Sequence, residues 1–282
     1  MKYFTDYHTH TEFSCDSTAP LDKMCERAIA LGMQELALTD HADFLSFKTF
    51  EEEIDLATRQ QAIIAAQEKY GNRCKILNGI EIGQPQANPA EYERMLQLYP
   101  FDFIIGSIHN LPNDVEINHL DYSQVNDMEL YTQFMEEEIK LVQNYDFDVL
   151  GHITMPQRYL YRRVRRSVDL TKFEEQYQEL FRLLIAREKG IEVNTSGIRQ
   201  GIDETMPNAL VLKWYRECGG KIITVGSDAH TPQDLGAAIP ETYQMLRELG
   251  FTHVMSYEKR EYQAHKLGRV LKLPTCVQSA NL

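Results

Sequence analysis

The segment Tyr3-Phe4-Thr5-Asp6-Tyr7-His8-Thr9-His10 is a short strand-like run that ends in two histidines. Each later run of this kind also ends either at a possible metal ligand or at another polar side chain. The run ends are His8/His10, Asp40-His41, Glu81, His109, His152, Asn194 and Asp228/His230. Strands that lie side by side in one parallel sheet have their C-terminal ends at a common edge. The repetition therefore predicts seven strand ends that share one site.

Strand-like and helix-like segments alternate along the chain. The predicted strands cover residues 3–8, 35–39, 75–82, 101–109, 148–152, 191–194 and 221–228, and the predicted helices 20–31, 51–70, 89–98, 123–144, 170–187, 206–218 and 241–249. The strands are short apolar runs without polar alternation, which is typical of strands covered on both faces. The alternation predicts a parallel α/β sheet. Chemistry at all seven strand ends favours a barrel, because an open sheet binds its ligands at one switch point.

No linker or repeat interrupts this pattern, so we expect a single domain over residues 1–282. Residues 251–256 could form a final strand, either closing the barrel or lying outside it. The tail from residue 267 onwards carries the weakest pattern.

The composition excludes several classes of protein. A net charge of −13 disfavours binding to nucleic acid. No run of 18 apolar residues is present, and the first residues lack the apolar core of a signal peptide, so we expect no membrane partner. The five cysteines form no CxxC pair, which disfavours a thiolate zinc site and indicates a reducing, cytoplasmic location.

The strand ends and the first loop supply nine candidate metal ligands. Taken alone, each has an ordinary alternative: a surface or hydrogen-bonded histidine, a solvated strand end or, for Asp16, a helix-capping turn. The pairs His8/His10 and Asp228/His230 favour metal binding over these alternatives, because residues two apart in a strand point the same way. Nine ligands exceed the four of one tetrahedral zinc and suit two or three divalent ions, with Zn, Mn or Fe favoured by the N/O donors. The candidates are His8, His10, Asp16, His41, Glu81, His109, His152, Asp228 and His230.

In these motifs the chain resembles the polymerase and histidinol phosphatase (PHP) family. The matching segments are Asp6-Tyr7-His8-Thr9-His10, Phe13-Ser14-Cys15-Asp16-Ser17, Leu38-Thr39-Asp40-His41, Gly79-Ile80-Glu81, Gly106-Ser107-Ile108-His109, Gly151-His152, Asn194-Thr195-Ser196-Gly197-Ile198-Arg199 and Gly226-Ser227-Asp228-Ala229-His230. The resemblance implies a distorted (β/α)7 barrel with a trinuclear metal centre at the C-terminal ends of the strands. It also implies hydrolysis of L-histidinol phosphate to L-histidinol and phosphate in histidine biosynthesis.

The resemblance further implies which residues bind each ion. One ion would be bound by His8, His10, Glu81 and Asp228, a second by Glu81, His109 and His152, and a third by Asp16, His41 and His230. Position 16 is aspartate here, where many family members carry histidine. The third site therefore departs from the family pattern.

The residues themselves point to phosphate hydrolysis. Neighbouring cations lower the pKa of a shared water and neutralise a phosphoryl group, and the chain has no GxSxG or P-loop motif. We therefore predict attack by a metal-bridging hydroxide without a phosphoenzyme. Arg158 and Arg199 follow two strand ends and could bind the phosphate through their planar guanidinium groups. The leaving alkoxide needs a proton or a cation, which a third ion or an acid near Asp228 and His230 could supply.

Other readings remain open from the sequence alone. The substrate could be another small phosphate ester, such as a nucleotide, a sugar phosphate or phosphotyrosine. A hydrolase of C–N bonds is disfavoured by Arg158 and Arg199, because a neutral amide needs no such cations. A non-catalytic metal-binding module is disfavoured by the full ligand set. The segment 111–122 carries Asp114, Glu116, His119 and Asp121, which could receive an amine or imidazolium or form an ordinary surface loop.

Overall fold

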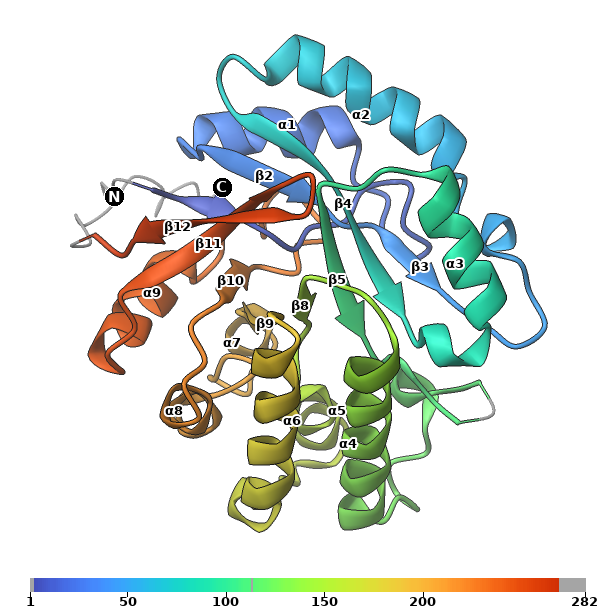
Figure 1. Cartoon of the computed structure of the whole chain (residues 1–282), viewed down its shortest axis with the longest axis vertical. Coiled ribbons are helices and arrows are strands. Elements are labelled where there is room, and N and C mark those ends of the chain that lie inside the picture. Colours follow the sequence, from blue (N-terminus) through green and yellow to red (C-terminus); the bar gives the residue numbers. More distant parts are fainter. Residues whose placement is uncertain (1–2, 113, 269–282) are drawn as a thin grey trace, which may run out of the picture.

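Seven parallel strands form the centre of the molecule (Figure 1). The computed structural model describes residues 3–112 and 114–268. The sheet order is β1-β2-β4-β5-β8-β9-β10. The strands are β1 (Thr5–Asp6), β2 (Glu35–Leu38), β4 (Lys75–Gly83), β5 (Phe103–Ser107), β8 (Val149–Leu150), β9 (Gly190–Asn194) and β10 (Ile223–Gly226).

The first and last strands meet, so the sheet curves into a barrel. Thr9 and Ala229 form a parallel bridge. The Tyr7 amide donates to the Val225 carbonyl at 3.1 Å, and the Asp228 amide donates to the His8 carbonyl at 2.8 Å. The predicted α/β barrel of seven parallel strands is therefore confirmed.

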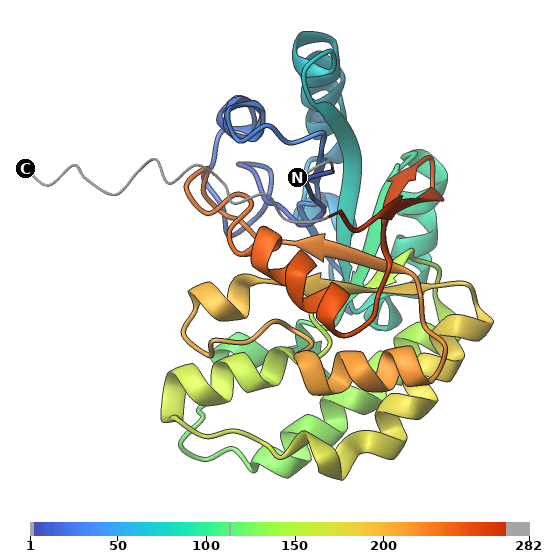
Figure 2. The ribbon, with the colours of Figure 1, turned by 90° about the vertical axis from the view of Figure 1, so that its left-hand side faces the viewer.

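Helices surround the sheet on its outside, as Figures 1 and 2 show. Their apolar sides face the strands; on α6, Tyr177, Leu180, Phe181 and Leu184 are buried, as the sequence pattern predicted. None of the helices in the described ranges is long and apolar enough to cross a bilayer. The helices are α1 (Leu21–Ala30), α2 (Leu56–Tyr70), α3 (Pro89–Leu98), α4 (Asp127–Asn144), α5 (Met155–Val164), α6 (Glu174–Ala186), α7 (Ser196–Arg199), α8 (Ala209–Glu217) and α9 (Ile239–Glu248), with short 3-10 turns at Phe50–Glu52, Pro85–Ala87, Ile117–His119 and Leu170–Phe173.

Several helices begin later than predicted, and α5 was not predicted. The helix predicted over residues 51–70 is a 3-10 turn followed by α2, because Asp55 caps α2 by accepting from the Thr58 amide. The helix predicted from residue 206 begins at Ala209, after the Asn208 side chain accepts from the Val211 amide. Helix α5 was not predicted as an element, because it follows the His152 strand end with hardly any turn sequence between them.

A hairpin outside the barrel covers the end opposite the site. It consists of β11 (His253–Glu258) and β12 (Glu261–Lys266) and crosses the ends of the barrel strands (Figure 1). Met255 and Tyr257 pack inside with Tyr7 and Phe103, and the Tyr257 amide donates to the Tyr7 hydroxyl at 2.8 Å. The segment 251–256 therefore contributes to a strand that covers one end of the barrel and is not part of its sheet. The tail beyond residue 268 lies outside the described residues.

One short strand and one pair of short strands lie on the side of the site. Strand β3 (His41–Asp43) extends along β4 and places His41 opposite Glu81. Strands β6 (Asn110–Leu111) and β7 (Val115–Glu116) pair after β5. Both therefore build the rim around the strand ends.

One buried carboxyl group on α4 is expected to destabilise the fold at neutral pH. Glu138 is 1% exposed, and burial raises its pKa well above the usual value. The folded state therefore retains a proton that the unfolded chain loses above about pH 4.5, so the destabilisation is absent at low pH and grows as pH rises. We expect Glu138→Gln to raise the free energy of unfolding by roughly 1–3 kcal/mol at pH 7 and by nothing measurable near pH 4. Urea unfolding at both pH values tests this; an equal gain from the exposed Glu136→Gln would contradict it.

Candidate metal centre

The nine predicted ligand residues lie together at the C-terminal ends of the strands. His8 and His10 follow β1, His41 begins β3, and Glu81 lies within β4. The loops after β5, β8 and β10 carry the rest, and Asp16 comes from the loop before α1. The complete set is His8, His10, Asp16, His41, Glu81, His109, His152, Asp228 and His230.

Glu81 is the centre of this cluster. Its Oε2 lies 3.0 Å from His8 Nε2 and 3.1 Å from His41 Nδ1. Its Oε1 lies 3.2 Å from His109 Nε2 and 2.9 Å from His152 Nε2. Burial would raise the pKa of Glu81, but the imidazoles of His8, His41 and His109 hold it well below the usual value. An ionised carboxylate with two histidines at each oxygen is suited to bridging two cations.

Asp228 approaches the same centre from β10. Its Oδ1 lies 3.4 Å from His10 Nε2 and 4.0 Å from His8 Nε2. Burial, together with the imidazoles of His230 and His41, lowers the pKa of His10 to about 4. His10 is therefore neutral at pH 7 and has a free lone pair for a metal ion.

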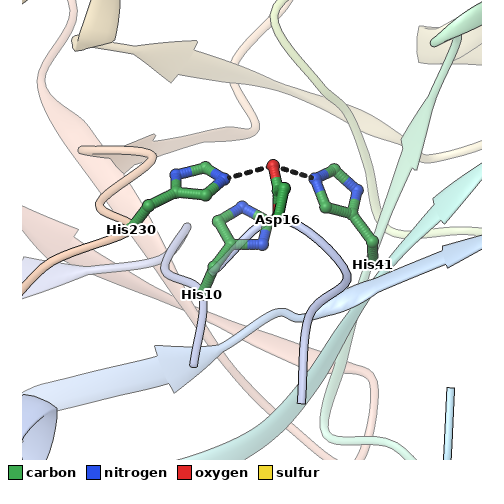
Figure 3. A group of neighbouring side chains, drawn as sticks. All are labelled: His10, Asp16, His41 and His230. Atoms are coloured by element: carbon green, nitrogen blue, oxygen red, sulfur yellow. Dashed lines mark hydrogen bonds and ion pairs between the residues drawn. The ribbon is translucent and has the colours of Figure 1, made fainter. Parts of the chain in front are cut away.

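Asp16 joins two histidines at the outer side of the cluster (Figure 3). Its Oδ2 lies 2.7 Å from His230 Nε2 and 3.5 Å from His41 Nε2. The His10 ring stacks on both His41 and His230, with centroids 4.5 and 4.1 Å apart. His10, Asp16, His41 and His230 thus offer ligand atoms that all lie within 4.8 Å of one another.

These donors suit divalent cations. Two further groups, His8/His10/Glu81 and His41/Glu81/His109, also have ligand atoms within 4.8 Å of one another. His10 Nε2 and His41 Nδ1 are buried and have no hydrogen-bond partner in the described part of the chain. His109 Nε2 and His152 Nε2 face each other at 3.3 Å. Bound metal ions would satisfy buried ring nitrogens that converge in this way.

Residues that the sequence did not single out orient the histidines. Asp43 Oδ1 lies 2.9 Å from His109 Nδ1. Ser14 Oγ lies 3.1 Å from His10 Nδ1 and accepts from the His41 amide at 3.1 Å. Both lie within two residues of a candidate ligand, so their position beside the motifs was the available signal.

The two predicted phosphate-binding arginines differ in their surroundings. Arg158, on α5, is 7% exposed; its Nη1 donates to Asp228 Oδ2 at 3.2 Å and to Ser196 Oγ at 3.1 Å. Arg199, on α7, donates to the main-chain carbonyls of Ser227 and Asp228, each at 2.9 Å. Arg158 therefore faces the cluster, and Arg199 holds the loop that carries Asp228.

A cavity of about 350 Å³ opens onto the cluster. Seven of the nine candidate ligands line it, together with Arg158 and Arg162. Glu116 and Asn118 from the predicted recognition segment also line it, but Asp114, His119 and Asp121 do not. The cavity thus combines a ligand cluster, two guanidinium groups and the carboxylates of Asp43 and Glu116.

The chain is similar to known phosphatases along nearly its whole length. A family model described as PHP domain matches residues 6–196. A histidinol-phosphatase of Lactococcus lactis is 27% identical over 271 residues, covering 93% of this chain and 97% of that protein. The crystal structure of histidinol phosphate phosphatase from Lactococcus lactis, complexed with zinc, L-histidinol and phosphate, has a TM-score of 0.82 at 26% identity, covering 92% of this chain and 98% of that one. A structure from Listeria monocytogenes, with a TM-score of 0.73 at 21% identity over 85% of this chain and 99% of that one, shares the fold.

Proposed function

Because the chain belongs to the PHP domain family, we propose that it is a metal-dependent phosphomonoesterase that hydrolyses L-histidinol phosphate to L-histidinol and phosphate. The observation that carries the proposal is the convergence of Glu81, Asp228 and the surrounding imidazoles beside Arg158 in one cavity. The Lactococcus lactis relative, whose crystal structure contains zinc, L-histidinol and phosphate, supports the same substrate.

We propose the ligand sets suggested by the sequence: His8, His10, Glu81 and Asp228 for one ion, Glu81, His109 and His152 for a second, and Asp16, His41 and His230 for a third. Zinc, manganese and iron suit these donors. Bound divalent ions supply a low-pKa water and neutralise phosphoryl charge.

The chain's own residues position the phosphate and the leaving group. Arg158 lines the cavity and can donate to phosphate oxygens through the nitrogens that face it. Arg199 keeps Asp228 in place through the Ser227 and Asp228 carbonyls. Asp228 and His230 lie on the same wall, where a proton or the third cation would reach the leaving alkoxide. We propose that Glu116, which lines the cavity and lies 2.9 Å from His119 Nδ1, receives the substrate ammonium group.

Comparing kcat/KM between substrates tests the choice of phosphate ester. L-histidinol phosphate should be hydrolysed with a higher kcat/KM than a nucleoside monophosphate, a sugar phosphate or phosphotyrosine. A clear preference for one of these three would overturn the substrate but retain the phosphatase reaction. The same logic applies to C–N bonds: hydrolysis of an amide without any phosphatase activity would reject the reaction class.

Replacing Arg158 should mainly weaken binding and stabilisation of the phosphoryl group. Loss of hydrogen bonds to a charged group costs about 1.5–3 kcal/mol, so Arg158→Ala should lower kcat/KM by roughly ten- to 150-fold. Arg158→Lys should recover only part of the activity, because lysine lacks the planar fork. Arg163, which is exposed and outside the cavity, provides the control variant Arg163→Ala. Unchanged kcat/KM in Arg158→Ala would remove this residue from the phosphate site.

The proposal also covers the binding partners of the protein and its location in the cell. The net charge of −13 argues against nucleic acid as a partner, and the cysteine pattern supports a cytoplasmic location. The partners are then the small phosphate ester and its products.

A further inference from the structure

Glu192 is a buried carboxylate behind the metal centre that the sequence motifs do not include. It lies in the middle of β9, is 0% exposed and points towards the residues that follow β1 and β8. Its Oε1 lies 2.6 Å from His8 Nδ1. Its Oε2 accepts from the main-chain amide of His152 at 3.0 Å. One carboxylate therefore contacts two strand ends that carry candidate ligands.

The contact with His8 defines which ring nitrogen can bind a metal ion. A carboxylate accepts hydrogen bonds, so His8 Nδ1 must carry the proton that it donates to Glu192. The lone pair is then on Nε2, which lies 3.0 Å from Glu81 Oε2 and 4.0 Å from Asp228 Oδ1. Metal-binding histidines commonly have their second nitrogen held in this way by a carboxylate.

The neighbouring strands leave space for this carboxylate. A Cβ atom added to Gly226 would lie 2.6 Å from Glu192 Oε1 and 2.3 Å from the Cβ of His8. A Cβ added to Gly151 would lie 3.5 Å from Glu192 Oε2. The side-chain nitrogen Nδ2 of Asn194 donates over a longer distance, 3.4 Å to each Glu192 oxygen. The close approach at Gly226 thus supports one fixed position of the side chain.

We propose that Glu192 is a positioning residue for the metal centre. Its carboxylate fixes the Nδ1-protonated form of His8 and holds the main chain at His152. The inference rests on the proposed metal-dependent function. Glu192 does not line the cavity and acts through His8 and the His152 main chain.

The variant Glu192→Gln tests this role with little change in size. Glutamine has one acceptor oxygen and one amino group, so it cannot accept from both His8 and the His152 amide. Loss of such an outer hydrogen bond typically lowers metal affinity 10- to 100-fold. We expect zinc titration of the metal-free protein, in competition with a chromophoric chelator, to show one ion bound 10- to 100-fold more weakly.

Glu35→Gln is the matched control. Glu35 is also a buried glutamate on a barrel strand, but it accepts from the Tyr7 hydroxyl and lies away from the metal ligands. This variant should bind zinc with the affinity of the parent protein. A zinc affinity in Glu192→Gln equal to that of the parent, or an equal loss in Glu35→Gln, would overturn the proposal.

Nitrogen NMR of the zinc-loaded protein reports which nitrogen of the His8 ring carries the proton. Replacing Glu192 would leave this tautomer unchanged if the residue only stabilised the fold. The parent protein should show one Nδ1-protonated tautomer, and Glu192→Gln a mixture; a single unchanged tautomer would overturn the proposal. Glu192→Asp, which keeps the charge but shortens the side chain, repeats both measurements if the glutamine variant does not fold. Zinc affinity is independent of the substrate, so failure to hydrolyse L-histidinol phosphate would reject the proposed substrate and leave the role of Glu192 intact.

Discussion

Replacing Gly226 with alanine is expected to lower kcat/KM by roughly two orders of magnitude. The new methyl group would lie 2.3 Å from the Cβ of His8 and 2.9 Å from its amide nitrogen. The His8 main chain cannot easily move away, because its carbonyl accepts from the Asp228 amide at 2.8 Å. His8 would therefore shift relative to Glu81, and a displacement near 1 Å is enough for such a loss. Steady-state kinetics with L-histidinol phosphate, at saturating zinc, measures the effect.

Thr224→Val is the control for this substitution. Thr224 lies two residues earlier on the same strand and is fully buried, and its hydroxyl lacks a hydrogen-bond partner among the residues that the structure describes. Replacing an unpaired hydroxyl with a methyl group should be nearly neutral. Parent-like activity in Gly226→Ala would show that the position of His8 tolerates this crowding, contrary to the geometry.

Replacing Arg59 with methionine is expected to lower the free energy of unfolding by about 3–5 kcal/mol. Arg59 is 1% exposed, and its Nε donates to Asp40 Oδ2 at 2.6 Å. Its other nitrogens donate to Asn78 Oδ1 and to the carbonyls of Leu38 and Gly79, at 2.7–2.8 Å. The substitution leaves the buried Asp40 carboxylate without its cation. Chemical denaturation measures the loss.

Two variants separate this cause from a general effect of removing an arginine. Arg94 pairs with Glu51 and Glu91 at the surface, where such pairs contribute about 0–1 kcal/mol, so Arg94→Met should have a small effect. Adding Asp40→Asn to Arg59→Met should recover part of the loss, because the uncompensated charge is then removed. Equal losses in the Arg59 and Arg94 variants would contradict the expected role of burial.

The barrel could be predicted from sequence because its signal is repeated. Seven apolar runs each end in a polar side chain, and parallel strands bring such ends together whatever the intervening helices do. The same pattern predicted that His8, Glu81 and Asp228 lie close together, and His8 Nε2 lies 3.0 Å from Glu81 Oε2 and 4.0 Å from Asp228 Oδ1. The assignment of ligands to individual ions, and the catalytic roles of Asp228, His230, Arg158 and Arg199, stay predictions.

Other features left no signal in the sequence. Arg59 sits in a helix of mixed polarity, where an arginine is usually solvated, and only the packing of α2 against β4 shows that it is buried. Glu192 stands inside an apolar strand, two residues before the matching segment that begins at Asn194, and its contact with His8 spans 184 positions of sequence. The position of the β11–β12 hairpin depends at once on side chains from β2, β4, β5 and β8 and on Tyr7, which follows β1. Contacts of this kind are set by tertiary packing and cannot be read from local patterns.

Removing and restoring the metal ions tests the central claim most directly. Protein stripped with a chelator, and shown by elemental analysis to be metal-free, should release no phosphate from L-histidinol phosphate above background. Adding zinc should restore activity as two to three ions bind per chain. Full phosphatase activity in the verified metal-free protein would contradict the account.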